Sequence, residues 1–144
     1  NKGHIVNISS AGGMVANLNL TEYCASKAAC SMVDECVRYE IRNMKKNVKT
    51  TQICPFYINT GMFEGVKRIA ITPILDQHWV VWRIITAIRQ EEPVVVMPWL
   101  FNLIWIAKAV MPPSVSDWMC DVVGAAKCMS EFKGRGNISS LKDN

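Results

Sequence analysis

Tyr23 and Lys27, one helical turn apart, have the clearest chemical potential in this sequence. Residues four apart lie on the same face of an α-helix, and the segment around them is predicted to be helical. A phenol titrates at about pH 10, so it exchanges protons poorly at neutral pH. A neighbouring ammonium group favours the phenolate. The pair is therefore suited to moving a proton to or from an alcohol or carbonyl oxygen.

Ser10 lies thirteen residues before Tyr23, in a loop that follows a predicted strand. In open α/β sheets, ligands bind at the carboxyl ends of the strands. We therefore expect the Ser10 hydroxyl to bind the same substrate oxygen as Tyr23. The tyrosine–lysine spacing is common by chance, and its alternative interpretation is a tyrosine on a helix surface. The spacing to Ser10, and a Pro55 loop after the next predicted strand, favour catalysis.

The elements that must position these residues alternate between strand and helix. Short β-branched runs predict strands at 4–10, 48–54 and 94–97. Apolar residues at helical spacing predict helices at 21–46, 73–92, 99–111 and 114–123. Thr21 is expected to cap the first helix. The alternation predicts an α/β fold with a parallel sheet and crossover helices.

Composition narrows the class of protein. The chain has 144 residues, of which 50% are hydrophobic and 19% charged, with a net charge of +4. These values indicate one folded domain and exclude a disordered or collagen-like chain. No nucleic-acid motif or basic stripe is present. The six cysteines and two histidines form no cluster with zinc-site spacing, so no metal site is expected.

The segment 93–111 is the most apolar part of the chain. It is interrupted by a proline, an asparagine and a lysine, whereas a spanning helix needs about 20 apolar residues. This favours a strand followed by a helix that is amphipathic or lies on a membrane surface. Trp99 and Trp105 suit a membrane interface. A place in the core or a substrate pocket is an equal alternative for them.

Three segments resemble the short-chain dehydrogenase/reductase family. They are Gly-His-Ile-Val-Asn-Ile-Ser-Ser at 3–10, Tyr-Cys-Ala-Ser-Lys at 23–27 and Cys-Pro-Phe-Tyr-Ile-Asn-Thr-Gly-Met-Phe at 54–63. The resemblance implies the carboxyl-terminal half of a Rossmann-type, doubly wound parallel sheet. Residues 1–131 would be part of one NAD(P)-binding domain, and 132–144 a polar tail that is expected to be disordered.

The resemblance also implies a role for each site residue. Ser10 would polarise the substrate oxygen and Tyr23 would be the general acid/base. Lys27 would favour ionisation of Tyr23 and bind the nicotinamide ribose. The cofactor would be NAD or NADP, in contact with Tyr23, Lys27, Pro55, Ile58 and Thr60, and the substrate would contact Ser10, Met62 and Phe63. Phe56 departs from the family, which usually has glycine there.

More narrowly, the chain is similar to the membrane-associated branch with retinol dehydrogenase 10, short-chain dehydrogenase/reductase 3 and 17-beta-hydroxysteroid dehydrogenases. The segments 59–65, 97–99, 127–129 and 132–135 carry this similarity. It implies a lipophilic substrate, retinoid first, and residence on the cytosolic face of the endoplasmic reticulum or on lipid droplets. It also implies contact with the membrane surface and a homodimer through the helix 21–46. Two alternatives remain: a steroid dehydrogenase, or a truncated, non-catalytic protein of the membrane or lipid droplet.

The family's glycine-rich phosphate-binding loop and its catalytic asparagine have no counterpart in these 144 residues, which begin at Asn1. We therefore expect the chain to be a piece of a longer enzyme. A parallel sheet without its first half leaves an edge and helix faces uncovered. We expect the chain by itself neither to fold stably nor to bind cofactor.

Overall fold

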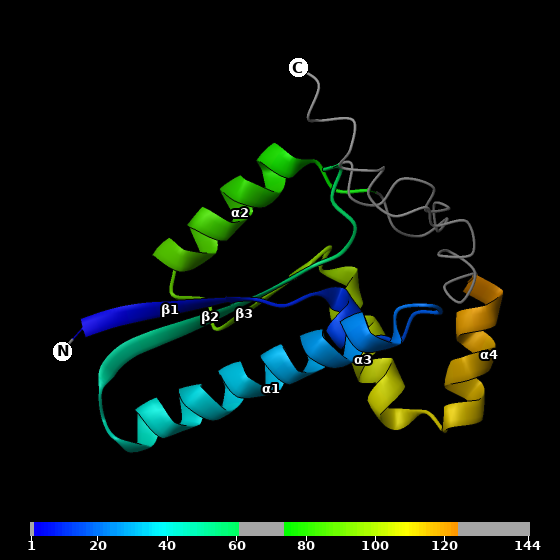
Figure 1. The fold of residues 1–144 in the computed structure, drawn as a ribbon, viewed down its shortest axis with the longest axis horizontal. Helices are drawn as coiled ribbons and strands as arrows, with labels where there is room; N and C mark the ends of the chain where they lie inside the picture. Colours follow the sequence, from blue (N-terminus) through cyan, green and yellow to red (C-terminus); the bar gives the residue numbers. More distant parts are fainter. Residues whose placement is uncertain (1, 61–73, 124–144) are drawn as a thin grey trace, which may run out of the picture.

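The computed structural model describes residues 2–60 and 74–123, and places helices on both faces of a parallel sheet (Figure 1). The strands are β1 (Lys2–Ile8), β2 (Asn47–Pro55) and β3 (Val94–Met97), paired in the order β1-β2-β3. The helices are α1 (Thr21–Asn43), α2 (Gln77–Arg89), α3 (Leu100–Val110) and α4 (Pro113–Val123), with a short 3-10 turn η1 (Ala11–Gly13) after β1. The predicted parallel α/β arrangement is confirmed.

The ends of two helices differ from the sequence prediction. Thr21 was expected to cap α1, but it is the first helical residue; Leu20 holds the cap position without a side-chain hydrogen bond. The helix ends at Asn43, earlier than predicted. α2 begins at Gln77 because the Asp76 carboxylate accepts a hydrogen bond from the Trp79 N–H at 2.9 Å.

The face of the sheet toward α2 is apolar. Successive residues of a strand point to opposite faces, so alternate positions of β2 and β3 share this side. Ile53, Val95 and Met97 are almost completely buried here. They pack with three buried residues from the end of the β2–α2 connection and from α2: Leu75, Val80 and Ala87. Hydrophobic burial therefore holds α2 on the sheet.

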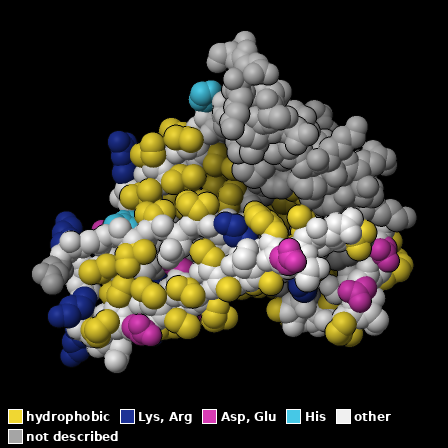
Figure 2. Space-filling view, viewed as in Figure 1, with side chains coloured by type: hydrophobic (Ala, Val, Ile, Leu, Met, Phe, Trp, Pro, Cys, Tyr) yellow, Lys and Arg dark blue, Asp and Glu magenta, His cyan; other side chains and the backbone are white. Residues whose placement is uncertain are grey.

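The opposite face, toward α1, is largely polar. The Asn7 amide donates to the buried Asp34 carboxylate at 2.6 Å, and Thr50 donates to its other oxygen at 3.4 Å. The apolar residues that predicted this helix lie mostly on its outer side, where Met32 and Val33 are more than half exposed. Figure 2 shows hydrophobic side chains where Figure 1 places α1. Directional hydrogen bonds therefore dominate the contact between α1 and the sheet.

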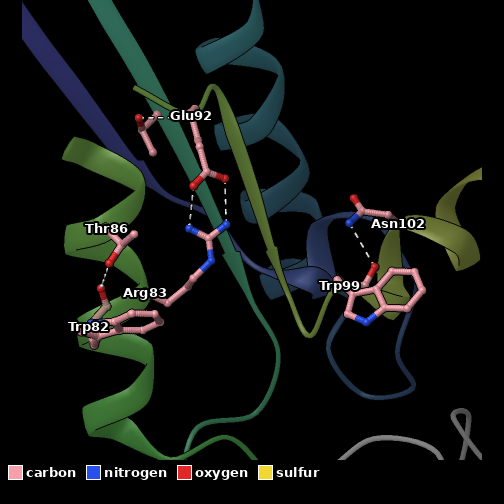
Figure 3. Close-up of polar contacts among 7 residues, drawn as sticks. Trp82, Arg83, Thr86, Glu92, Trp99 and Asn102 are labelled. Atoms are coloured by element: carbon pink, nitrogen blue, oxygen red, sulfur yellow. Dashed lines mark hydrogen bonds and ion pairs between the residues drawn. The ribbon is translucent and has the colours of Figure 1, made fainter. Parts of the chain in front are cut away.

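An ion pair ties the middle of α2 to the segment that leads into β3. Both Arg83 guanidinium NH groups donate to Glu92, at 2.8 and 2.7 Å (Figure 3). Hydrogen bonding from Arg83 lowers the pKa of the Glu92 carboxyl. Since the pKa is lower in the folded state, this pair stabilises the fold at pH values above the unfolded pKa.

The substitution Glu92→Gln is expected to lower the free energy of unfolding by about 0.5–1 kcal/mol at neutral pH. The lowered pKa of Glu92 sets the direction of this effect and its pH range. The stabilisation is complete above the unfolded pKa of about 4.3 and is lost as the pH falls through the folded pKa. Urea denaturation of the whole protein, wild type and variant, as a function of pH measures the difference. A difference that persists in strong acid contradicts the ionic origin.

The apolar segment 93–111 forms a strand and a separate helix, as predicted. β3 takes its first part and α3 its second. Among residues 2–60 and 74–123, no helix has the length and apolar character needed to cross a membrane.

Candidate active site

Ser10 lies where the carboxyl ends of β1 and β2 meet. It caps η1: its Oγ accepts a hydrogen bond from the Gly12 N–H at 3.1 Å and donates to the Pro55 carbonyl at 3.4 Å. The side chain is buried, so both contacts are shielded from solvent. The turn that follows β1 therefore fixes the hydroxyl at the carboxyl edge of the sheet, where ligands bind in open α/β folds.

The first turn of α1 brings Tyr23 to Ser10. A Cβ placed on Gly12 would lie 3.3 Å from the ring carbon Cε1 of Tyr23 and 3.5 Å from Ser10 Oγ. The Tyr23 ring and the Ser10 hydroxyl thus both lie next to Gly12. Because Gly12 has no side chain, the ring from α1 and the hydroxyl of the residue that caps η1 both lie close to this position.

Lys27 reaches the same edge from the next turn of α1. Its Nζ lies 5.8 Å from the centre of the Tyr23 ring and donates to the carbonyl of Ile8, the last residue of β1, at 3.0 Å. An ammonium group is thereby held beside the tyrosine, where it favours negative charge on a nearby oxygen. The structure brings Ser10, Tyr23 and Lys27 together; their chemical roles stay predictions.

Comparison with known proteins identifies the family of this chain. A sequence profile described as short chain dehydrogenase matches residues 1–69. Epidermal retinol dehydrogenase 2 of Mus musculus is 38% identical over 138 residues, which cover 94% of this chain and 45% of the relative. Retinol dehydrogenase 10 of Homo sapiens is 32% identical over 92% of this chain and 40% of the relative. The chain belongs to the short-chain dehydrogenase/reductase family.

Solved structures of this family share the fold. A short-chain dehydrogenase from Burkholderia cenocepacia J2315, determined in complex with NADP, aligns with a TM-score of 0.64 at 24% identity over 83% of this chain and 48% of its own. A putative short-chain dehydrogenase from Novosphingobium aromaticivorans aligns with a TM-score of 0.55 at 16% identity. The chain thus spans less than half the length of the family members it matches.

Three of the predicted cofactor contacts lie at the end of β2 or just after it. Pro55 is its last residue, and its carbonyl holds Ser10. Ile58 pairs with Leu75 and packs against the α2-side core, whereas Thr60 is exposed and its N–H donates to the Ile58 carbonyl at 2.8 Å. The predicted substrate contacts Met62 and Phe63 lie outside the described residues, as does the tail 132–144.

The donor groups at this edge fit a nicotinamide riboside. The ammonium of Lys27 and the hydroxyl of Tyr23 suit the hydroxyls of a ribose, and the exposed Thr60 suits a carboxamide. Contact between these residues and a cofactor stays a prediction.

Phe56, the departure from the usual family glycine, is accommodated by aromatic packing. Its ring centre lies 4.6 Å from that of Phe101 in α3 and 4.3 Å from that of Tyr57. Its N–H donates to the Met97 carbonyl at 2.8 Å, which continues the pairing of β2 with β3. The larger side chain thus packs against the buried cluster that contains Ala11, the residue after Ser10.

Sequence reasoning missed a buried polar group beneath the site. Ser31 of α1 is hydrogen-bonded to Ser9, which follows β1, and to Gln52 of β2. Gln52 also donates to the Cys54 sulfur at 3.2 Å. Burial raises the pKa of Cys54, so its sulfur stays protonated at neutral pH. The signal was present in the sequence as Gln52, a polar residue inside an otherwise β-forming run.

Proposed function

We propose that the whole protein that carries this chain is an NAD(P)-dependent oxidoreductase. It would interconvert a lipophilic alcohol, retinol first, and the corresponding aldehyde. The observation that carries the proposal is the meeting of Ser10, Tyr23 and Lys27 at the carboxyl end of β1. The choice of a retinoid is supported by relatives named retinol dehydrogenases at 32–38% identity.

In this proposal each residue has one task. The Ser10 hydroxyl exchanges its long bond to the Pro55 carbonyl for a hydrogen bond to the substrate oxygen, and so fixes the position of that oxygen. The Tyr23 oxygen takes the proton of the alcohol, or returns it to the carbonyl in reduction. The Lys27 ammonium stabilises the phenolate and binds a ribose hydroxyl. Bound NAD or NADP supplies the chemistry of hydride transfer.

The test is an assay of the whole protein with all-trans-retinol and a 17-hydroxysteroid, each with NAD and with NADP. Oxidation of retinol in preference to the steroid, measured as reduced nicotinamide absorbance, is the expected result. Preference for the steroid would replace the retinoid while keeping the chemistry. Absence of turnover with both alcohols, together with absence of cofactor binding, would favour the non-catalytic alternative.

A membrane surface is the second partner that we propose. The proposal rests on exposed tryptophans in α3, in α4 and just before α3. Trp99, Trp105 and Trp118 are each at least half exposed. Indole rings are favoured at the boundary between water and lipid. We propose residence on the cytosolic face of the endoplasmic reticulum or on lipid droplets. Flotation of the whole protein with phosphatidylcholine vesicles tests it, and failure to float would contradict it.

A second copy of the protein is the partner proposed for α1. Its outer apolar residues, Met32 and Val33, have no cover within the described residues, being 59% and 58% exposed. We expect the whole protein to be a dimer, and Met32→Asp to convert it to a monomer because the carboxylate would be buried unpaired. Light scattering after gel filtration measures this. Glu40→Asp, an exposed position of α1 that is already acidic, is the control.

A further inference from the structure

Ser9, the neighbour of the proposed catalytic serine, is itself bound to the helix that carries Tyr23. Its side chain is 2% exposed. The hydroxyl donates to the Lys27 carbonyl at 2.8 Å and is hydrogen-bonded to the Ser31 hydroxyl at 2.7 Å. The buried Ser9 oxygen is thus hydrogen-bonded to two successive turns of α1.

The hydrogen bonds of Ser9 continue through Ser31 to Gln52 in β2, and every donor in this series points the same way. The Gln52 amide donates to Ser31 at 2.6 Å. Because Ser9 has one hydroxyl proton and gives it to the Lys27 carbonyl, its oxygen accepts from Ser31. Gln52, Ser31 and Ser9 therefore form a chain of donors that ends on the backbone of Lys27. We call these three residues the Ser9 relay.

The Ser9 relay matters because apolar packing does little to fix α1 here. Near the site, α1 meets the sheet through Lys27, Cys30 and Ser31, of which Lys27 and Cys30 contact the Ile8 carbonyl. The next residue that faces the sheet, the buried Asp34, is polar and hydrogen-bonded. Apolar contacts are non-directional, whereas hydrogen bonds set both distance and direction. The register of the first turns of α1 against β1 therefore depends on these bonds.

We propose that Ser9 is a positioning residue for the dehydrogenase reaction, setting where Tyr23 and Lys27 lie relative to Ser10. The inference rests on the proposed function. Tyr23 and Lys27 belong to α1 and move together, whereas Ser10 belongs to the turn after β1. A shift of α1 would leave the tyrosine–lysine pair intact and separate it from the oxygen that Ser10 holds.

The experiment compares Ser9→Ala with Thr51→Val in the whole protein. Thr51 is a matched control: its buried hydroxyl also makes one bond to a carbonyl, of Glu92 at 2.8 Å, and one to a side chain, of His4 at 2.7 Å. It lies on the α2 side of the sheet, whereas the relay lies on the α1 side. Both variants remove one buried hydroxyl with two partners.

Ser9→Ala is expected to lower kcat about 10- to 100-fold, the scale of a displacement near 1 Å at a reacting centre. KM and the midpoint of the pH profile should be unchanged, because Tyr23 and Lys27 keep their relation to each other. Thr51→Val should retain the wild-type kcat. An equal fall in both variants, or no fall in Ser9→Ala, overturns the proposal.

Ser31→Ala removes the relay residue that belongs to α1, and it makes no change next to Ser10. It removes one of the two partners of Ser9 and should lower kcat in the same sense but less. An undiminished kcat in Ser31→Ala would show that Ser9→Ala acts on Ser10 directly, and would overturn the relay.

Amide hydrogen exchange gives a readout that needs no turnover. We expect faster exchange in residues 23–31 of Ser9→Ala than of Thr51→Val, since the first turns of α1 would lose their anchor. Unchanged exchange overturns the positioning role. If the wild-type protein lacked dehydrogenase activity, the proposed function would fail by itself, and exchange would still decide whether Ser9 anchors α1.

Discussion

Replacing Tyr23 by phenylalanine is expected to lower kcat of the whole protein by about 10²–10⁴-fold, the usual contribution of a positioned acid or base. The change removes one oxygen and no carbon. The ring edge would still pack beside Gly12, so the fold has no reason to change. Loss of the phenolic oxygen leaves the substrate proton without an acceptor, although Ser10 and Lys27 remain in place.

Tyr39→Phe is the matched control for this experiment. Tyr39 lies on the same helix, is 49% exposed, and stands beside the guanidinium groups of Arg38 and Arg42 rather than near Ser10. Its substitution should leave kcat unchanged. Cofactor binding and the melting temperature, measured for both variants, separate chemistry from folding. A Tyr23→Phe protein that turns over at the wild-type rate would exclude Tyr23 as the acid/base.

The parallel sheet was accessible to sequence reasoning because strand patterns are local. The prediction of a strand at 94–97, the range that the structure gives to β3, rests on a short and very hydrophobic run of three valines and a methionine. The grouping of Ser10, Tyr23 and Lys27 was equally accessible. It follows from a loop after a strand and from a spacing of four on a helix, which are both local features.

The orientation of α1 was not accessible in the same way. Apolar periodicity predicts that a helix has an apolar side, but it does not say what covers that side. In the structure the apolar side of α1 faces outward, and Asp34 is buried against the sheet. The partners of Asp34 are Asn7 and Thr50, 27 and 16 residues away in the sequence, so no local pattern could have indicated them.

Long-range contacts also explain what was missed at the site. The spacing placed Lys27 beside Tyr23, but its bond to the Ile8 carbonyl joins residues 19 apart. The bond from Ser9 to the Lys27 carbonyl joins residues 18 apart. Such contacts depend on the distance between α1 and the end of β1. That distance is set by the size of the residues between them, and one of those residues is glycine.

Gly13→Ala is expected to destabilise the fold by about 3 kcal/mol and to lower kcat as well, because the added carbon overfills the contact between η1 and α1. A Cβ on Gly13 would lie 2.7 Å from the Lys27 carbonyl carbon, and 2.9 Å from both the Lys27 oxygen and the Ala28 nitrogen. These are backbone atoms of a helix, so they cannot rotate away as the end of a flexible side chain would. Either η1 or the first turns of α1 must move.

Gly3→Ala provides the control, because a Cβ there would meet only the Val48 side chain at 4.0 Å, an ordinary contact distance. Urea denaturation and kcat of the two variants should therefore differ sharply. Gly13 and Ser9 act on the same carbonyl of Lys27: Gly13 permits the approach of α1, and the Ser9 hydroxyl holds it at 2.8 Å. If Gly13→Ala were as stable and as active as Gly3→Ala, the close approach of α1 to the end of β1 would not be what places Tyr23 beside Ser10.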